Sequence, residues 1–284
     1  MNFKNNNEAR NFDSHTVAGF GDEWQRFTQN ELDQEEKERI FQEYFAIFPW
    51  HLLPDGGGQG VDVGCGSGRW ATMVARRVKV LHCIDASSVA LEVAKSNLSV
   101  FDNIQFQCTS VDAMPFPAGS LDFAYSLGVL HHVPDTQAAI CSIAGKLKRG
   151  APFLLYLYYA FDNRPLWYRW LWRTTELGRH WISRLPGPPR YFISQIIAVS
   201  IYWPLARLAK ILAGIGCLPV AWPLAYYRNK SFYVMRTDAL DRFGTRLEQR
   251  FTRIQIEEML KNAGFLGIRF SDAPPYWCAL GIKA

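Results

Sequence analysis

The residues best suited to chemistry lie in a glycine-rich segment. Residues 61–71 read VDVGCGSGRWA, in which Gly64, Gly66 and Gly68 alternate with small residues after the acid Asp62. Glycines allow positive backbone φ angles and let the backbone approach a ligand closely. Such a turn after a short apolar run is typical of sites for nucleotide-like ligands. NAD, ATP and S-adenosylmethionine are the three candidates.

The residues after the glycines argue against two of these ligands. A dinucleotide turn has the spacing GxGxxG, and Arg69 takes the place of its third glycine here. A phosphate-binding loop ends in Gly-Lys-Ser or Gly-Lys-Thr, which GSGRW does not contain. What remains is GxGxG after an acidic strand residue. This pattern resembles the glycine motif of the class I S-adenosylmethionine-dependent methyltransferases.

Three further stretches resemble that family, in the same order along the chain. Asp85 in HCIDAS, followed by Ala86, matches the acid that accepts hydrogen bonds from both ribose hydroxyls. Asp112 in SVDAMPFP matches the residue at the adenine amino group, and Ala113 supplies a backbone N–H. The segment 121–135, LDFAYSLGVLHHVPD, matches the fourth strand, whose start lies against the methionine moiety. The cofactor-binding residues that the resemblance implies are Asp62, Gly64, Cys65, Gly66, Gly68, Asp85, Ala86, Asp112, Ala113, Ser126 and Leu127.

For three of these positions a structural role is the alternative. Asp62 is also suited to cap the turn, and Asp112 to an ordinary turn before MPFP. Cys65 suggests a nucleophile, but the sequence places no histidine partner beside it, so a small space-filling residue is the preferred interpretation. The six cysteines are scattered, without a CxxC pair or clustering with histidine. This usage predicts a reducing, cytoplasmic location and no metal site.

Two adjacent histidines and a tyrosine are the candidate catalytic residues. Methyl transfer from a sulfonium is an in-line displacement, for which a protein supplies alignment, exclusion of water and, for some acceptors, a base. His131 and His132 follow the fourth predicted strand, at the edge where open α/β sheets bind substrates. They are the candidate bases, one facing the pocket and the other packing. Tyr158 leaves the fifth predicted strand at the same edge.

These residues require a sheet whose strands end at one edge, and the pattern of the chain predicts one. Strands are expected at 60–64, 79–85, 103–111, 120–127 and 151–159, and helices at 33–48, 69–78, 87–98 and 134–150. This alternation predicts an α/β fold with a doubly wound, mostly parallel sheet. A helix at 252–264, opened by the capping-box pair Thr252 and Gln255, precedes two final strands at 265–271 and 276–283. Together with the resemblance, this order implies a seven-stranded, Rossmann-like methyltransferase sheet, whose last two strands are expected to be antiparallel to each other.

A basic, aromatic segment interrupts the alternation between the fifth and sixth strands. Residues 151–236 contain 11 Lys or Arg against 2 acids, and 19 of the 41 aromatic residues of the chain. The stretch 191–227 is very apolar, but Pro204, Arg207 and Lys210 interrupt it, so a membrane-spanning helix is not predicted. The preferred interpretation is a helical lid buried against the core. A peripheral membrane contact and an RNA-binding surface are the alternatives.

The predicted organisation has three parts. Residues 1–50 form an N-terminal helical cap without a secretory signal, residues 51–159 and 237–284 form the cofactor-binding core, and residues 160–236 form the helical insertion. The resemblance covers roughly 20–150 and 237–284. It implies a cytoplasmic methyltransferase, with membrane association as the alternative, and leaves the oligomeric state open.

The expected acceptor is a small molecule, a glycan or a lipid-linked molecule, anionic or amphipathic. Nucleic acid is disfavoured, because SLGVLHH stands where amino-methylating enzymes of nucleic acids and proteins carry an Asn-Pro-Pro-Tyr motif. A non-catalytic S-adenosylmethionine-binding module that acts as a partner protein is the alternative function.

Overall fold

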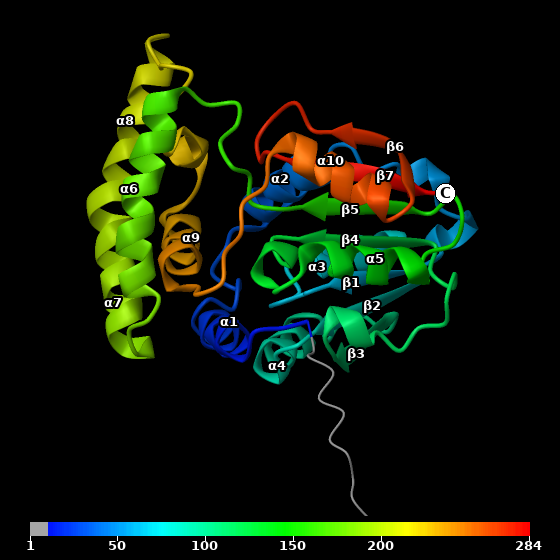
Figure 1. Ribbon diagram of the computed structural model, residues 1–284. Helices are drawn as coiled ribbons and strands as arrows, with labels where there is room; N and C mark the ends of the chain where they lie inside the picture. Colours follow the sequence, from blue (N-terminus) through cyan, green and yellow to red (C-terminus); the bar gives the residue numbers. More distant parts are fainter. Residues whose placement is uncertain (1–10) are drawn as a thin grey trace, which may run out of the picture.

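The computed structural model, which describes residues 11–284, places seven strands in one sheet (Figure 1). The strand order is β3-β2-β1-β4-β5-β7-β6. Only β7 runs antiparallel to its neighbours β5 and β6; the other paired strands are parallel. The strands are β1 (Gln59–Val63), β2 (Val80–Asp85), β3 (Ile104–Cys108), β4 (Phe123–Leu127), β5 (Pro152–Tyr156), β6 (Phe265–Phe270) and β7 (Cys278–Lys283). The predicted seven-stranded, mostly parallel sheet is confirmed.

Helices cover both faces of this sheet, and each face has its own apolar cluster. One cluster joins the sheet to α5 (Thr136–Lys146) and α10 (Arg253–Asn262). The other joins it to α2 (Gln34–Phe45), α3 (Ala71–Val74) and α4 (Ser88–Asn97). This is the doubly wound arrangement, in which helices cover both faces of the sheet, while the edge strands β3 and β6 stay partly exposed.

Several helix ends follow from capping residues, while two helices are shorter than predicted. The Thr252 hydroxyl accepts from the Gln255 backbone N–H, and the Gln255 side chain accepts from the Thr252 N–H, so the capping box is present. The helix predicted at 69–78 is α-helical only over α3 and then tightens into a 3₁₀ turn. The helix predicted at 134–150 ends at Lys146, because buried Leu147 turns to an extended conformation and bridges to Leu121.

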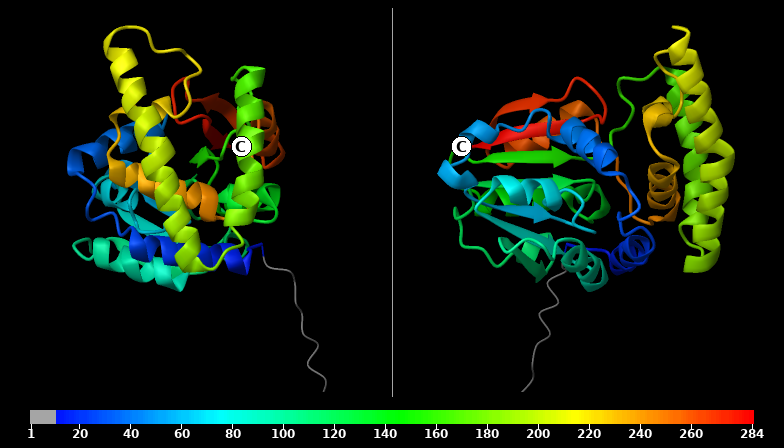
Figure 2. Two further views of the ribbon diagram at one scale, coloured as in Figure 1. Left: turned by 90° about the vertical axis from the view of Figure 1, so that its left-hand side faces the viewer. Right: turned by 180° about the vertical axis from the view of Figure 1, so that it is seen from behind.

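A helical layer stands at the carboxyl edge of the sheet (Figures 1 and 2). It consists of α6 (Leu166–Ile182), α7 (Gly187–Ile197), α8 (Trp203–Gly214) and α9 (Phe232–Gly244). A π-helical turn, Ala198–Tyr202, joins α7 to α8 just before Pro204, which cannot donate a backbone hydrogen bond. The boundary predicted at 237 falls inside α9.

The helices of this layer are not equally buried. α9 lies between the sheet and the other helices. In the continuous helix Gly187–Gly214, by contrast, only 22% of the most apolar 18-residue stretch is buried. The expectation that the stretch 191–227 is buried against the core is therefore wrong for this helix, because α9 occupies that space. By length and composition Gly187–Gly214 is also sufficient to cross a membrane.

Candidate active site

The glycine-rich turn connects the end of β1 to α3 in a left-handed conformation. Gly64 and Gly66 have φ angles of 78° and 53°. The backbone N–H groups of Gly64 and Cys65 both donate to the Ile84 carbonyl, at 2.8 and 3.0 Å, which fixes the turn to the end of β2. A Cβ on Gly66 would lie 2.8 Å from the ring of Trp24. The backbone of the turn is thus positioned by its neighbours and has no room for a side chain at its centre.

Asp85 ends β2 beside this turn. Its Oδ2 accepts from the Gly66 N–H at 3.0 Å and its Oδ1 accepts from the Ser87 N–H at 2.8 Å. Each carboxylate oxygen keeps a free lone pair for a ligand hydroxyl. Burial raises the pKa of Asp85, and the two N–H donors oppose that rise.

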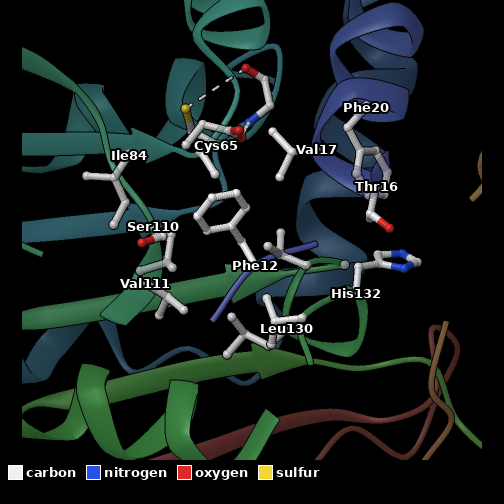
Figure 3. A pocket seen from close by; sticks show the side chains of 18 of the residues that line it. Phe12, Thr16, Val17, Phe20, Cys65, Ile84, Ser110, Val111, Leu130 and His132 are labelled. Atoms are coloured by element: carbon white, nitrogen blue, oxygen red, sulfur yellow. Dashed lines mark hydrogen bonds between the residues drawn. The ribbon is translucent and has the colours of Figure 1, made fainter. Parts of the chain in front are cut away.

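A cavity of about 130 Å³ opens over the turn and the ends of β2 and β4 (Figure 3). Several predicted residues line it: Gly64, Cys65, Gly66, Asp85, Ala86, Leu127 and His132. The others lie outside its lining: Asp62, Gly68, Asp112, Ala113, Ser126, His131 and Tyr158. The structure therefore brings about half of the predicted site residues into one cavity.

Two of the residues outside the lining are part of the core. Asp62 is buried, and its Oδ2 accepts from the Tyr125 hydroxyl at 2.9 Å. Burial raises the pKa of Asp62 to about 8. The Ser126 hydroxyl donates to the Val63 carbonyl at 2.9 Å, which ties β4 to β1. Both side chains therefore stabilise the strands β1 and β4 next to the glycine-rich turn.

Asp112 and Ala113 lie on an exposed 3₁₀ turn at the rim. The backbone N–H of Asn11 donates to Asp112 Oδ2 at 3.2 Å, so the N-terminal segment reaches this residue.

The helix α1 (Ser14–Arg26) and the residues before it cover the cavity. The side chains of Phe12, Thr16, Phe20 and Trp24 line it, and the Phe12 ring points into its centre (Figure 3). Phe27, just after the end of α1, is buried against the Tyr233 ring and does not line the cavity. Phe12 and Thr16 carry no motif and were missed. Residues 1–10 of the predicted N-terminal cap lie outside the described residues.

Cys65 lines the cavity, but its thiol is a poor nucleophile. The neighbouring Cys83 thiol and burial raise its pKa well above the ordinary value. A thiol is nucleophilic only as the thiolate. The side chain therefore fills space, and all six cysteines of the chain are free.

The two adjacent histidines have different environments. His131 is fully buried: its ring stacks on Tyr158 with centroids 3.8 Å apart, and its Nδ1 accepts from the Tyr158 backbone N–H at 3.4 Å. Burial lowers the pKa of His131 well below the ordinary value. His132 lines the cavity at its rim, edge-on to Phe20.

The hydrogen bonds of His132 determine its tautomer. Its Nδ1 lies 2.6 Å from the Leu247 carbonyl oxygen, which can only accept, so Nδ1 carries the proton. In the neutral ring Nε2 is then the nitrogen with the free lone pair. Nε2 is buried, has no hydrogen-bond partner among the described residues, and lies 3.7 Å from Asp241 Oδ1.

Asp241, on α9, was not identified from the sequence. Its Oδ2 accepts a hydrogen bond from the Tyr158 hydroxyl. Burial raises its pKa, and the nearby His132 opposes that rise. No motif indicated Asp241, because the helix that brings it to His132 follows the insertion and its position depends on tertiary packing.

The cavity fits a polar, nucleotide-like ligand. Four of the residues that line it have a buried side-chain polar atom without a hydrogen-bond partner among the described residues: Thr16 Oγ1, Ser67 Oγ, Arg69 Nε and His132 Nε2. Buried polar groups without partners are costly, and a ligand with matching groups would satisfy them. The glycine-rich turn, whose backbone a ligand can approach closely, and the Asp85 carboxylate at the end of β2 are further polar partners for such a ligand.

Known proteins resemble the chain over part of its length. Residues 61–155 match the family described as "Methyltransferase domain". A ubiquinone biosynthesis O-methyltransferase of Albidiferax ferrireducens is 37% identical over 117 residues, 40% of this chain and 45% of that protein. A demethylmenaquinone methyltransferase of Tropheryma whipplei is 34% identical over 153 residues, 54% of this chain and 52% of that protein. The chain thus matches about half the length of these relatives.

Solved structures share the fold over nearly the whole chain. A Methanococcus maripaludis protein, described as an S-adenosylmethionine-dependent methyltransferase, superposes with a TM-score of 0.52, 15% identity and 97% coverage of each chain. A Haloferax volcanii chain, solved in a complex of a methyltransferase and its activator, has a TM-score of 0.52 and 14% identity, with 93% of this chain and 97% of that chain covered. Residues 61–155 thus match a methyltransferase domain, and the chain shares the fold of these solved structures. Both findings agree with the predicted resemblance to the class I S-adenosylmethionine-dependent methyltransferases, whose cofactor is S-adenosylmethionine.

Proposed function

We propose that the chain transfers a methyl group from S-adenosylmethionine to a hydroxyl oxygen of an amphipathic, lipid-linked acceptor, with His132 as the general base. The observation that carries this proposal is that His132 lines the cofactor cavity and that its Nε2 is unpartnered among the described residues, 3.7 Å from Asp241 Oδ1. A hydroxyl acceptor needs a base, because its oxygen loses a proton as the new bond forms.

The residues at the turn and at the end of β2 would hold the cofactor. The backbone of Gly64 and Gly66 would contact its methionine part, and the two oxygens of Asp85 would accept from its ribose hydroxyls. When bound, the cofactor supplies an electrophilic methyl group on a sulfonium, which is already an excellent leaving group. The chain therefore has to align the acceptor, exclude water and remove one proton.

His132 is suited to remove that proton. The Leu247 carbonyl holds the ring in the tautomer whose lone pair is on Nε2. After Nε2 takes the proton, the imidazolium would be stabilised by the Asp241 carboxylate. The Tyr158 hydroxyl donates to the same carboxylate and fixes its orientation. His131, packed under Tyr158 with a lowered pKa, has a supporting role in this scheme.

Charges near this pair favour an acceptor with a neutral polar head over an anionic one. Besides Asp241, the buried carboxyls of Glu23 on α1 and Asp238 on α9 interact electrostatically with one another. Burial raises the pKa of Glu23 well above its ordinary value and that of Asp238 to about 6. The Arg69 guanidinium lowers both pKa values, but burial outweighs it. An anionic head would therefore add negative charge beside carboxyls that are already costly to ionise.

The names of the relatives give a first set of acceptors. One relative is named for an O-methylation in ubiquinone biosynthesis and another for demethylmenaquinone. We would therefore supply the purified chain with methyl-labelled cofactor and four acceptor classes: prenylated phenols, the same phenols without the prenyl tail, hydroxybenzoates and hydroxylated fatty acids. We expect label on the oxygen of a prenylated phenol.

The variant His132→Gln tests the base, because it removes the lone pair that accepts the proton. We expect a rate loss of about 10²–10⁴-fold, the usual contribution of a general base, with unchanged binding of S-adenosylhomocysteine. A loss below about threefold would exclude His132 as the base. Preferential labelling of the hydroxybenzoate would instead favour an anionic acceptor, and cofactor binding without transfer to any class would favour the non-catalytic module.

A further inference from the structure

Large apolar side chains are concentrated on the outside of the helical layer. Fifteen of the twenty large apolar side chains that are exposed in the described residues lie between positions 166 and 220. They include Trp170 at 64%, Trp181 at 76%, Phe192 at 66% and Ile211 at 62% exposure. We call the exposed side of α6 and of the helix Gly187–Gly214 the outer face. Soluble domains rarely expose apolar patches of this extent unless a partner covers them.

The inner side of the same helices is fixed to the protein. The buried residues of Gly187–Gly214 that face α9 include Ser194, Ala198, Tyr202 and Ala206, spaced four apart. In Figure 1 α9 lies between the outer helices and the sheet, and the left view of Figure 2 looks directly onto the outer face. The outer face therefore points away from the rest of the molecule.

Polar contacts hold both helices in this orientation. On α6, Arg179 donates to the Thr245 carbonyl at 2.8 Å, and Glu176 pairs with Arg242 of α9. On α7, Gln195 accepts from Arg236 at 2.6 Å. A helix held along one side by a folded domain is not free to cross a bilayer. Gly187–Gly214 is thus placed to lie along a membrane surface, although its length and composition would permit a span.

The charge of the layer indicates what covers the outer face. Residues 163–236 contain eleven Lys or Arg and one acid, Glu176. That acid pairs inward with Arg242 and with Arg179, so it does not balance the exposed cations Arg173 and Lys210. A second copy of the chain would bring these like charges together, whereas anionic headgroups would neutralise them.

We propose that the outer face rests on a membrane surface that carries anionic lipids, with α6 and Gly187–Gly214 parallel to the bilayer. Exposed tryptophans suit this position, because an indole ring is most stable at the boundary between headgroups and acyl chains. Apolar burial supplies the attachment and the cations add selectivity for anionic lipid. This surface is separate from the cofactor cavity, which the sheet and α1 form on the other side of α9.

The test is co-sedimentation of the purified full chain with vesicles of phosphatidylcholine alone and with one third phosphatidylglycerol. The first variant is Trp170→Glu/Trp181→Glu/Ile211→Glu, which places acids on the outer face. Its matched control, Val100→Glu/Ile254→Glu/Leu266→Glu, makes the same charge change at exposed apolar positions outside the helical layer. Binding of S-adenosylhomocysteine is measured for every variant and reports folding independently of membrane attachment.

A second pair of variants tests the charge. Arg173→Gln/Lys210→Gln removes two exposed cations of the layer, and Arg149→Gln/Arg269→Gln removes two exposed cations of the core. Each cation near an anionic surface contributes a factor of about five to binding, so we expect the first pair to weaken binding to anionic vesicles by about 25-fold.

We expect binding to anionic vesicles that is weaker with pure phosphatidylcholine and falls with salt. We expect its loss in the outer-face variant and its retention in both controls. Equal binding by the outer-face variant and its control would overturn the proposal. So would a chain that ignores vesicles but forms a dimer that the outer-face acids dissociate, which would assign the face to a second copy. Resistance of bound chain to alkaline carbonate would instead indicate a spanning helix.

Discussion

Asp62→Asn should remove a pH-dependent loss of stability that the buried carboxyl imposes on the fold. Asp62 is 1% exposed, and burial raises its pKa from 3.8 to about 8. The folded chain therefore binds a proton that the unfolded chain has released by pH 5. A raised folded-state pKa contributes stability that is complete below about pH 4 and is lost as the pH rises through 8. The whole loss is about 6 kcal/mol, or about 1.4 kcal/mol per pH unit within that window.

Urea unfolding of the wild type and Asp62→Asn from pH 6 to pH 9 measures this slope. The range is chosen because Asp238, with a pKa of about 6, adds a slope of the same sign at lower pH. We expect the variant to gain about 2 kcal/mol relative to the wild type between pH 6 and pH 8. Tyr125→Phe is the control: it removes the hydroxyl that stabilises the carboxylate, so its slope should persist to higher pH. If the free energy of unfolding had the same pH dependence in the wild type and in Asp62→Asn, Asp62 would not have a raised pKa in the folded chain.

Three further substitutions and one control test the cavity. Asp85→Ala should weaken S-adenosylhomocysteine binding by roughly 1–3 kcal/mol, the scale of a lost charged hydrogen-bond partner; unchanged affinity in calorimetry would remove Asp85 from the site. Gly66→Ala should raise the dissociation constant by about tenfold or more, because its Cβ would lie 2.8 Å from Trp24 and would displace the turn that is proposed to contact the cofactor. Gly56→Ala, at a φ of 79° with open space around it, should strain the backbone without changing that constant. Cys65→Ala should keep most methyl transfer, and a loss beyond a hundredfold with intact cofactor binding would restore the nucleophile interpretation.

The sheet was predictable because its signals are local. Strands and helices alternate in apolar pattern, and Ser87, Thr252 and Gln255 mark helix starts by their own hydrogen bonds. Helix ends were less predictable. The end of α5 depends on Leu147, which leaves the helix to bridge to Leu121 in the core. Nothing in the residues around Leu147 encodes that long-range contact.

The site was predictable where the backbone itself forms it. The glycine turn and Asp85 are adjacent to strand ends, so their place in the sheet follows from the pattern. Asp241 and Phe12 come to the cavity from α9 and from the segment before α1, which are distant in the sequence and placed by packing. Asp62 was assigned to the cofactor from its place in the motif, yet its partner is the Tyr125 hydroxyl in the core.

The same distinction applies to the insertion. Its helices could be predicted, and its aromatic and basic character could be read directly, because these properties belong to the segment itself. Which side of Gly187–Gly214 is covered depends on α9, whose inward position decides that Phe192 and Ile211 remain exposed. A pattern that is apolar on every side does not reveal this choice.

Isothermal titration of the purified chain with S-adenosylhomocysteine tests the central claim most directly, with NAD and ATP titrated under the same conditions. The account predicts one site per chain for S-adenosylhomocysteine and no binding of the other two, because the glycine turn lacks the third glycine and the lysine that those ligands require. A folded chain that does not bind S-adenosylhomocysteine, or that binds NAD or ATP in its place, would contradict it.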